Sequence, residues 1–363
     1  MIRDLGTLGR SFISSQAADI NESGQIVGGS GTGSLGRAFI WENVKMTPLG
    51  TLGGLESSAA RINNQGQVIG GSLTRTPARG HGFIWQGGKM TDLGTLGGRS
   101  GAGPRAINDR GQIVGDAATK SGARHAFLWQ DGKLRDLGTL GGPSSIAMAI
   151  NERGQIVGSS DTAGGSQHAF LWQNGRMRDL GTLGGAYAAG SSAVAINERG
   201  QVVGSSYSAT VSYGQLGAGV HAFLWQNGKM RDLGTLGRTP PTSAAVAIND
   251  RGEIIGNSPA TGAGHPFLWR NGKMIDLGTL GEGPSGAVAI NNRGQVIGDS
   301  VPVGSHGMSH AFLWQNGKLT DLGTLGGFVS VPAAINNHDQ IVGASNTANG
   351  KGHAVLWTLK PGS

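Results

Sequence analysis

The chain has 363 residues, of which 68 are Gly and 12 are Pro, and only 14% are charged. It contains no Cys, which excludes disulfides, thiolate metal sites and a cysteine nucleophile. No uncharged apolar run approaches the length of a membrane-spanning helix, and the first residues lack the apolar stretch of a secretory signal, so we expect neither feature. The abundance of Gly and small polar residues favours turns and strands over helices.

Three sequence strings recur eight times each, with a period of about 44 residues. The string D-L-G-T-L-G begins at Asp4, Asp92, Asp136, Asp179, Asp232, Asp276 and Asp321, with a P-L-G-T-L-G variant at Pro48. A string that starts I-N begins at Ile20, Ile62, Ile107, Ile150, Ile196, Ile248, Ile290 and Ile335. The string H-A-F-L-W, or a variant of it, ends at Trp41, Trp85, Trp129, Trp172, Trp225, Trp269, Trp314 and Trp357. The repeat therefore fills the chain.

Each repeat predicts four short strands, in the same order. In the unit from Ala193 to Gly234 we expect them at 193–197, 201–204, 221–225 and 229–233. The first two are separated by a short turn with Gly200, and the last two by an Asn-Gly pair, which is a strong hairpin signal. A variable loop connects the second strand to the third. No segment has a helical period long enough to predict a helix.

A period of 40–45 residues with four strands per unit is typical of a β-propeller blade. Blades converge on an axis and spread at the rim, and here the first strand is rich in Ala while Phe and Trp lie on the third. The alternative, a β-solenoid, uses shorter coils of parallel strands and does not need two tight hairpins per unit. We therefore predict an all-β fold, with residues 1–363 forming a single propeller domain of eight four-stranded antiparallel blades.

The two ends of the chain predict how the ring closes. The last unit reaches Trp357 and then lacks a fourth strand, whereas the first residues, Met1–Leu5, match the fourth strand at 229–233. We expect the N-terminal strand to complete the last blade. This closure removes the open sheet edges that promote aggregation.

The three recurring strings resemble those of the HAF-repeat family of bacterial extracellular repeat proteins. The resemblance covers essentially the whole chain, although the first repeat has Arg37 where the others have His. It implies an extracellular or cell-surface location. It implies no activity and no catalytic residue.

The residues that repeat in every unit are interpreted as framework. Because packed sheets lie about 10 Å apart, equivalent His residues of neighbouring blades cannot share one metal ion, whose ligands bind at about 2.1 Å. We expect each His to bond the Asp of D-L-G, each Asn to cap its own turn, and each Trp to fill the wedge between blades. We therefore predict no metal site and no cofactor; a functional ring of Asn at the channel mouth is the alternative.

The formal net charge of +7 and the pI near 10.0 raise nucleic acid as a partner. However, the basic residues recur on hairpin turns, as at Arg153 and Lys229, and acids such as Glu152 interrupt them. This arrangement is a ring of solubilising charges rather than a continuous strip that follows a phosphate backbone. The pattern argues against nucleic acid and leaves an acidic polymer open.

Function is expected on the face that carries the loops between second and third strands and between successive blades, since all length variation falls there. The aromatic residues that the repeat does not explain also fall in these loops, together with non-repeated polar groups. The candidate binding residues are Phe12, Tyr187, Tyr207, Tyr213, Phe328, Glu56, Glu282 and His306.

These observations predict a non-catalytic binding or scaffolding propeller that engages a glycan or a partner protein. The alternative is a carbohydrate-active enzyme, a hydrolase or lyase, with Glu56 and Glu282 as the first suspected acids, although these belong to blades that are well apart. A purely structural surface-layer protein is a third interpretation. The sequence assigns no catalytic residue and does not determine the oligomeric state.

Overall fold

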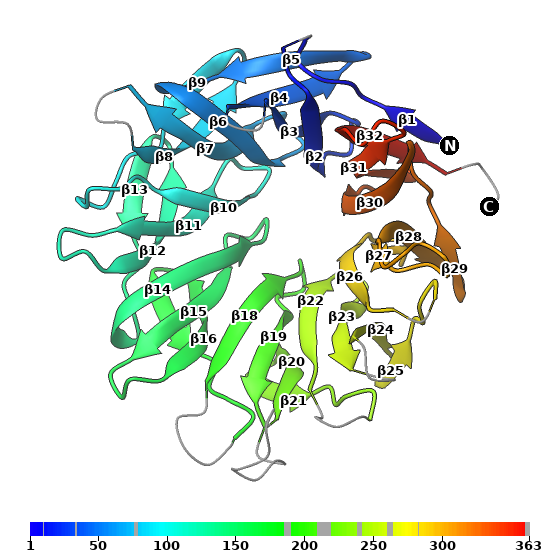
Figure 1. Ribbon diagram of the computed structural model, residues 1–363. Coiled ribbons are helices and arrows are strands. Elements are labelled where there is room, and N and C mark those ends of the chain that lie inside the picture. Colours follow the sequence, from blue (N-terminus) through cyan, green and yellow to red (C-terminus); the bar gives the residue numbers. More distant parts are fainter. Residues whose placement is uncertain are drawn as a thin grey trace.

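The computed structural model describes residues 1–9, 11–32, 35–75, 79–184, 190–208, 219–237, 242–259, 264–281 and 283–359. Within these ranges the chain forms eight four-stranded antiparallel sheets arranged as a ring (Figure 1). The first strand of each sheet lies nearest the axis, and the first strands of neighbouring sheets contact one another all round the ring. The predicted eight-bladed β-propeller is confirmed.

The blades are numbered in chain order. Blade one comprises β2 (Ser14–Ile20), β3 (Ile26–Gly31), β4 (Gly36–Glu42) and β5 (Lys45–Gly50). Blade two comprises β6 (Gly53–Ile62), β7 (Val68–Thr74), β8 (Gly80–Gln86) and β9 (Lys89–Asp92). Blade three comprises β10 (Gly103–Ile107), β11 (Ile113–Ala118), β12 (Arg124–Gln130) and β13 (Lys133–Asp136). Blade four comprises β14 (Gly141–Ile150), β15 (Ile156–Thr162), β16 (Gln167–Gln173) and β17 (Arg176–Asp179).

The second half of the ring repeats this order. Blade five comprises β18 (Ser191–Ile196), β19 (Val202–Tyr207), β20 (Val220–Gln226) and β21 (Lys229–Asp232). Blade six comprises β22 (Ala244–Ile248), β23 (Ile254–Pro259), β24 (Gly264–Arg270) and β25 (Lys273–Asp276). Blade seven comprises β26 (Ser285–Ile290), β27 (Val296–Ser300), β28 (His310–Gln315) and β29 (Lys318–Asp321). Blade eight comprises β30 (Gly326–Ile335), β31 (Gln340–Thr347), β32 (Gly352–Thr358) and β1 (Ile2–Asp4).

Glycine is required at two places in the repeat. In the hairpin of blade five that joins β20 to β21, Asn227 has φ 52° and Gly228 has φ 79°, the left-handed conformation that an Asn-Gly turn provides. In β19, a side chain on Gly204 would place its Cβ 1.9 Å from the carbonyl oxygen of Ser192, because β18 bulges toward it. The chain therefore needs Gly where the second strand passes the bulge.

The hydrophobic core lies between blades. The interface of blades four and five buries Leu171 and Leu180 of one blade against Val202, Phe223 and Trp225 of the next. The Phe at this repeat position is fully buried in blades one to seven, and Val355 takes its place in blade eight. Because each blade buries its apolar residues against both neighbours, no blade has a core of its own.

The string D-L-G-T-L-G connects one blade to the next through hydrogen bonds. Asp232 Oδ1 accepts the N–H of Gly234 at 2.7 Å, which closes the turn after β21. The hydroxyl of Ser243, in the segment that enters blade six, donates to the carbonyl oxygen of Gly234 at 2.6 Å and accepts the N–H of Ala222 at 2.9 Å. This small side chain therefore joins two blades.

The expected bond between His and the Asp of D-L-G is present in every blade except the first. The distance from Nδ1 to the nearer carboxylate oxygen is 2.7–2.9 Å. The pairs are His81–Asp92, His125–Asp136, His168–Asp179, His221–Asp232, His265–Asp276, His310–Asp321 and His353–Asp4. Of these seven His residues, His221 and His265 are buried and the other five are half-buried. Blade one changes both partners together, to Arg37 and Pro48.

The Asn that follows each first strand joins all eight blades in a closed ring. Each Oδ1 accepts backbone N–H groups of its own turn, as Asn197 does from Arg199 and Gln201. Each Nδ2 donates to the carbonyl oxygen of the equivalent Asn in the next blade at 2.9–3.1 Å. The ring runs through Asn21, Asn63, Asn108, Asn151, Asn197, Asn249, Asn291 and Asn336, and from there back to Asn21. The predicted turn cap is confirmed, and it is also a bond between blades.

A second ring lies one residue further along the chain. The side chain at this position accepts the backbone N–H of the equivalent residue in the preceding blade at 2.7–3.1 Å. Its members are Glu22, Asn64, Asp109, Glu152, Glu198, Asp250, Asn292 and Asn337. The acids on these turns therefore hold neighbouring blades together.

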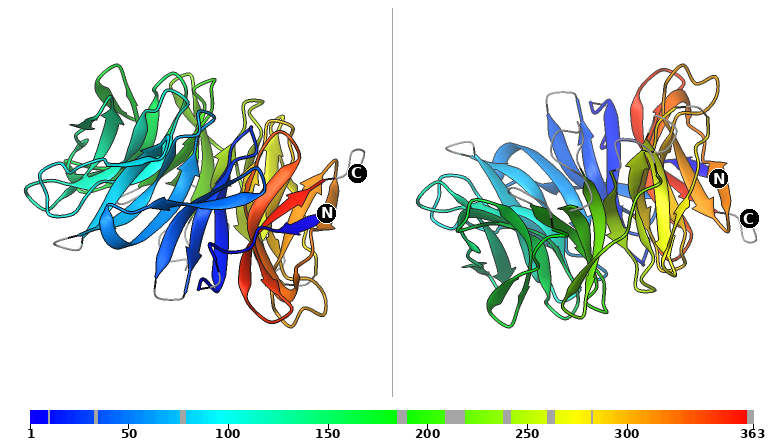
Figure 2. Two further views of the ribbon diagram at one scale, coloured as in Figure 1. Left: turned by 90° about the horizontal axis from the view of Figure 1, so that it is seen from above. Right: turned by 90° about the horizontal axis from the view of Figure 1, so that it is seen from below.

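The predicted closure is confirmed. Strand β1 pairs antiparallel with β32, with Ile2 opposite Trp357 and Asp4 opposite Val355. Asp4 also supplies the carboxylate that His353 contacts, and Leu5 belongs to the core between blades eight and one. Strand β1 lies beside β32, the last strand that the structure describes (Figure 2). Blade eight is therefore composed of residues from both ends.

Deletion of residues 1–9 should lower the melting temperature far more than trimming of a free tail would. The deletion removes the ladder of β1, the partner of His353 and part of the core between blades eight and one. Thermal unfolding followed by circular dichroism measures the effect. Deletion of residues 360–363 is the control, and equal melting temperatures for the two truncations would contradict the closure.

Replacement of Asn197 by Ala should lower the free energy of unfolding by about 1–3 kcal/mol, because the turn N–H groups lose their acceptor and the carbonyl oxygen of Asn249 loses one of its two donors. Asn197→Asp retains the acceptor of the turn and removes the amide that donates to the next blade and to Gln201 Oε1. Chemical denaturation of both variants separates the two contributions. An unchanged stability in Asn197→Asp would show that the bond between blades contributes nothing.

Candidate functional site

The ring has two faces of different character, which Figure 2 shows edge-on. The tight turns between first and second strands and between third and fourth strands lie on one face, here called the hairpin face. The connections between second and third strands, and from each fourth strand to the next blade, lie on the other, here called the variable-loop face. The five candidate residues that the structure describes belong to segments of the variable-loop face.

The structure places five of the predicted binding residues. Phe12 is half-buried in the segment that enters blade one, and Tyr207 keeps 50% of its surface exposed. Phe328 is 71% exposed in blade eight, and Glu56 and His306 are exposed in blades two and seven. Tyr187, Tyr213 and Glu282 lie outside the described residues.

Three of these residues lie in strands, where loops were expected. Tyr207 is the last residue of β19, opposite Val220. Glu56 and Phe328 lie near the beginning of the long strands β6 and β30. The register shifts there, between Gly53 and Ser57 in β6 and between Gly326 and Ser330 in β30, so both residues lie in irregular segments. The segment after L-G-G extends the strand before the bulge, so the side chains point outward from a sheet edge rather than from a free loop.

A group of aliphatic side chains on the same face was missed by the sequence analysis, which counted only aromatic residues. Among the described residues, ten large apolar side chains are exposed, and eight of them belong to segments of the variable-loop face. Seven of these eight come from four successive blades, seven, eight, one and two, and are here called the apolar arc. Its members are Val303, Met308, Phe328, Val331, Ile13, Leu35 and Leu55.

Several apolar side chains of the arc are highly exposed, although contact of apolar side chains with water is unfavourable. Val303 is 81% exposed, Phe328 71% and Leu55 66%. Leu55 and Phe328 occupy equivalent positions, two residues before the Ser that joins the blade to its neighbour. Glu56 and His306 provide polar groups within the same four blades. Of the predicted residues, Phe328 is a member of the arc and Glu56 and His306 lie in the blades at its two ends, whereas Tyr207 lies apart from it in blade five.

Tyr207 borders a pocket of about 330 Å³ between blades four and five. The pocket is lined mainly by Gly and Ser residues, among them Gly165, Ser191 and Ser206. Tyr207 N–H donates to the carbonyl oxygen of Gly190 at 3.0 Å, which holds the end of β19 against the entry to blade five. The pocket offers one aromatic face and several hydroxyl groups.

A pocket of about 280 Å³ lies at the axis on the hairpin face. Ile and Asn side chains of the first strands line it, including Asn151, Asn197 and Asn249. Each Asn amide is already engaged in the ring of bonds between blades, and no buried side-chain nitrogen or oxygen among the described residues lacks a partner. The amides of the Asn ring are therefore already used in bonds between blades, which argues against the alternative of a ligand-binding Asn ring.

Asp19, in the first strand of blade one, is the acid that burial affects most clearly. Burial raises the pKa of its carboxyl above 3.8, while Arg61 and the N–H groups of Ile62 and Ile20 lower it in part. The carboxylate accepts both N–H groups, at 3.0 Å each, and Ile62 belongs to blade two. Both oxygens are therefore used to connect backbone segments, which is a structural task.

The described ranges contain no group of three or more His, Asp or Glu placed to hold a metal ion. No helix in the described part of the chain is long and apolar enough to cross a membrane.

The comparisons with known proteins support the fold. No protein-family model and no curated protein matches this sequence. Among solved structures, the chain is similar to dipeptidyl peptidase 4 of Porphyromonas gingivalis, with a TM-score of 0.55 and 9% identity, over 98% of this chain and 58% of that one. It is also similar to the β-propeller domain of the Trilobed protease of Pyrococcus furiosus, with a TM-score of 0.51 and 10% identity, over 84% of this chain and 94% of that domain.

A third similar structure is a puromycin-hydrolyzing peptidase of Mycobacterium tuberculosis, with a TM-score of 0.51 and 13% identity, over 82% of this chain. This chain spans 51% of that peptidase and 58% of the dipeptidyl peptidase. At these identities the likeness shows the β-propeller fold alone.

The raised pKa of Asp19 predicts a pH effect on stability. Because the folded protein holds this proton more tightly than the unfolded chain, the free energy of unfolding should fall as the pH rises from 3.8 through the folded-state pKa and then stay constant. Urea unfolding at a series of pH values, compared between the parent and Asp19→Asn, isolates this contribution. Removal of the cation in Arg61→Ala should extend the fall to higher pH, and a difference between parent and Asp19→Asn that is constant with pH would contradict the assignment.

Proposed function

We propose that this chain is a non-catalytic binding propeller that engages a partner protein through the apolar arc of its variable-loop face. The observation that carries the proposal is that, among the residues that the structure describes, exposed aliphatic and aromatic side chains concentrate on four successive blades of one face. Soluble proteins rarely leave large apolar groups together in water unless another surface covers them.

The contrast between the two faces supports this choice. On the hairpin face, the described residues include Val44 as an exposed large apolar side chain, apart from the chain end at Met1. The same repeat builds all eight blades, so framework requirements alone predict similar exposure in every blade of the variable-loop face. The concentration of exposed apolar side chains in four blades, among the described residues, therefore needs a reason outside the framework, and contact with a partner supplies one.

The chemistry of the arc favours a protein over a glycan. Val, Leu, Ile and Met side chains bury apolar area but offer few hydrogen bonds, whereas sugars need polar partners around an aromatic face. Phe328 and Leu55 project from strands that the Ser bonds hold against the neighbouring blades. A rigid platform of this kind loses little conformational entropy on binding.

The resemblance to the HAF-repeat family extends the proposal to an extracellular or cell-surface location. Treatment of intact producing cells with a protease tests it: degradation of this protein while a cytoplasmic marker survives supports a surface location. Survival of both proteins, together with absence of this protein from the medium, would contradict it.

Selection of a random-peptide phage library on the immobilised propeller tests the arc. We expect the selected peptides to bind at least about tenfold more weakly to Phe328→Ser or Leu55→Ser, since a buried anchor in a protein interface contributes about 2 kcal/mol or more. Titration by surface plasmon resonance measures the change. Val44→Ser on the hairpin face is the matched control and should bind like the parent.

Tyr207→Ala distinguishes the arc from the pocket in blade five. If the selected peptides lose affinity for Tyr207→Ala and retain it for Phe328→Ser and Leu55→Ser, the binding surface lies in blade five. If a glycan competes with these peptides at the arc, the partner is a sugar and the proposed protein ligand is wrong.

A further inference from the structure

The Trp that ends each third strand faces the fourth strand of the preceding blade. In four of the eight interfaces, an Arg of that strand covers the indole ring, with its Cζ 5.2–5.4 Å from the ring centroid. The pairs are Arg3–Trp41, Arg135–Trp172, Arg178–Trp225 and Arg231–Trp269. The same Arg side chains approach the Gly of the next hairpin, as Arg178 does at Gly228.

Four interfaces lack an Arg at this position, and two of them leave their Trp accessible. Thr47 and Thr91 stand at the Arg position beside Trp85 and Trp129, the two Trp residues in the described part of the chain that are only half-buried. Ile275 and Thr320 stand at the equivalent position in the strands that precede Trp314 and Trp357, which are buried nevertheless. Burial together with the absence of Arg therefore identifies the interfaces of Trp85 and Trp129.

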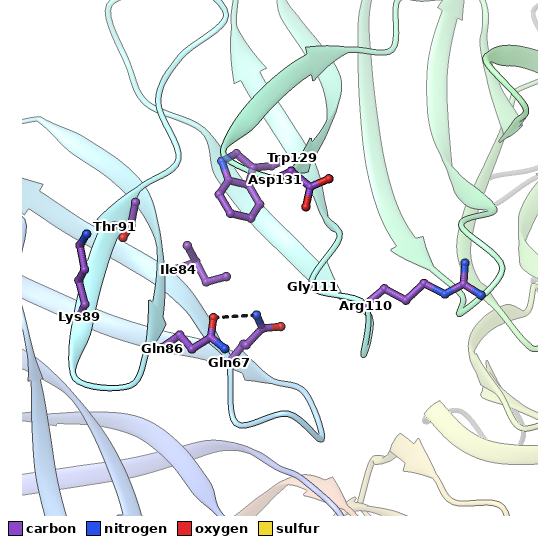
Figure 3. Close-up of a pocket in the computed structure, with 9 residues that line it drawn as sticks. All are labelled: Gln67, Ile84, Gln86, Lys89, Thr91, Arg110, Gly111, Trp129 and Asp131. Carbon is purple, nitrogen blue, oxygen red and sulfur yellow. Dashed lines mark hydrogen bonds between the residues drawn. The ribbon is translucent and has the colours of Figure 1, made fainter.

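A pocket is present at each of the two uncovered Trp residues. The Trp129 groove, about 430 Å³, is lined by Thr91, Trp129, Lys89, Arg110 and Asp131 among others. Figure 3 shows the indole of Trp129 beside Thr91 and Ile84, with Lys89 on one side of the groove and Arg110 on the other, its side chain extending away from the indole. Gln67 and Gln86 form its floor and are hydrogen-bonded at 3.1 Å.

The second pocket, between blades one and two, is here called the Trp85 groove, and it shares the Thr and Trp positions with the Trp129 groove. Its volume is about 500 Å³, and Thr47, Trp85, Phe12 and Arg37 are among its lining residues. Arg37 is the residue that replaces the framework His in blade one, and Pro48 replaces its Asp partner. Phe12, a predicted binding residue, therefore contributes to this groove rather than to the apolar arc.

We propose that the Trp85 and Trp129 grooves are two saccharide-binding sites, each of which stacks one pyranose ring of an acidic, uronate-bearing oligosaccharide on its indole. The stacked ring occupies the place that a guanidinium group fills in four other interfaces. These sites lie outside the apolar arc and do not depend on the partner that the arc binds.

The lining groups decide between a sugar and a cation as the occupant. An indole face accepts a guanidinium, as the four Arg–Trp pairs demonstrate. However, the charged groups of the Trp129 groove are two cations and one anion, and the Trp85 groove contributes Arg37. These donors repel a cationic ligand and suit carboxylate and hydroxyl oxygens. The combination of an aromatic face with donors on its flanks is that of an acidic sugar site.

The size of the grooves fits an oligosaccharide. Both volumes fall within the range of about 300–1,000 Å³ typical of small-molecule sites. Lys89 and Arg110 come from different blades, so a ligand that contacts both must extend across the interface. A single guanidinium would leave most of such a groove unfilled.

Restoration of the missing Arg is the sharpest test. Isothermal titration calorimetry with a galacturonic acid trisaccharide should give two sites on the parent protein. Thr91→Arg should cover Trp129 and reduce the number of sites to one, and the double variant with Thr47→Arg should bind at least about tenfold more weakly or not at all. These variants should melt no lower than the parent, because Arg occupies this position in four other blades.

Thr320→Arg is the matched control. It adds the same charge at the equivalent position of blade seven, beside Trp357, which is only 2% exposed, and it should leave both sites intact. A neutral glucose trisaccharide of the same length should bind at least about tenfold more weakly than the galacturonate, since it lacks the carboxylates that Arg37, Lys89 and Arg110 attract.

Three outcomes would overturn the proposal. They are the absence of galacturonate binding, equal binding of the neutral trisaccharide, and a site number that the double Thr→Arg variant leaves unchanged. Preferential binding of an arginine-rich peptide that the double variant abolishes would identify a cation as the occupant instead. Phe328→Ser should not affect the saccharide, and the Thr→Arg variants should not affect the selected peptides, so each proposal can fail without the other.

Discussion

The amide of the Asn after each first strand donates to the carbonyl oxygen of the equivalent Asn in the next blade, and the eighth such bond returns to the first blade. This closed circuit sets one spacing for every interface, because no blade can move outward without breaking two bonds. The rest of the repeat follows from that spacing. The fully buried Phe, the Gly opposite the bulge and the Ser between blades each fit a gap of fixed width. A change at any of these positions has to be accommodated by both neighbouring blades.

The same constraint explains where variation is tolerated. Loops on the variable-loop face and the fourth-strand position beside the Trp lie outside the Asn ring, so substitutions there leave the spacing unchanged. Leu55 and Phe328 occupy one such position, and Thr47 and Thr91 another. In both cases, a departure from the repeat exposes apolar or aromatic surface instead of disturbing the framework. Residues that depart from the repeat therefore carry the most information about function, and both proposed ligand surfaces include such residues.

The candidate site could be predicted only in part from the sequence. Phe12, Phe328 and Glu56 were identified because they fall outside the repeat, and the structure exposes Phe328 and Glu56. The aliphatic members of the apolar arc were missed, because the sequence alone does not show whether a Val or Leu side chain is exposed or buried. The accessible faces of Trp85 and Trp129 were missed for a related reason. All eight Trp residues share one motif, and the residue that covers each ring belongs to the preceding blade.

The amino-acid sequence by itself determined the eight blades, the four strands of each, the positions of both tight turns and the closure by β1. All of these depend on local pattern, on repetition and on the missing fourth strand of the last unit. Only the tertiary structure determined which residues of neighbouring blades contact one another. The donor from each Asn to the next blade, the carboxylate of Asp19 on the N–H of Ile62, and the Arg over each covered Trp join residues of different blades that are far apart in the sequence. Such contacts depend on the angle and distance between sheets, and no local pattern in the sequence encodes these quantities.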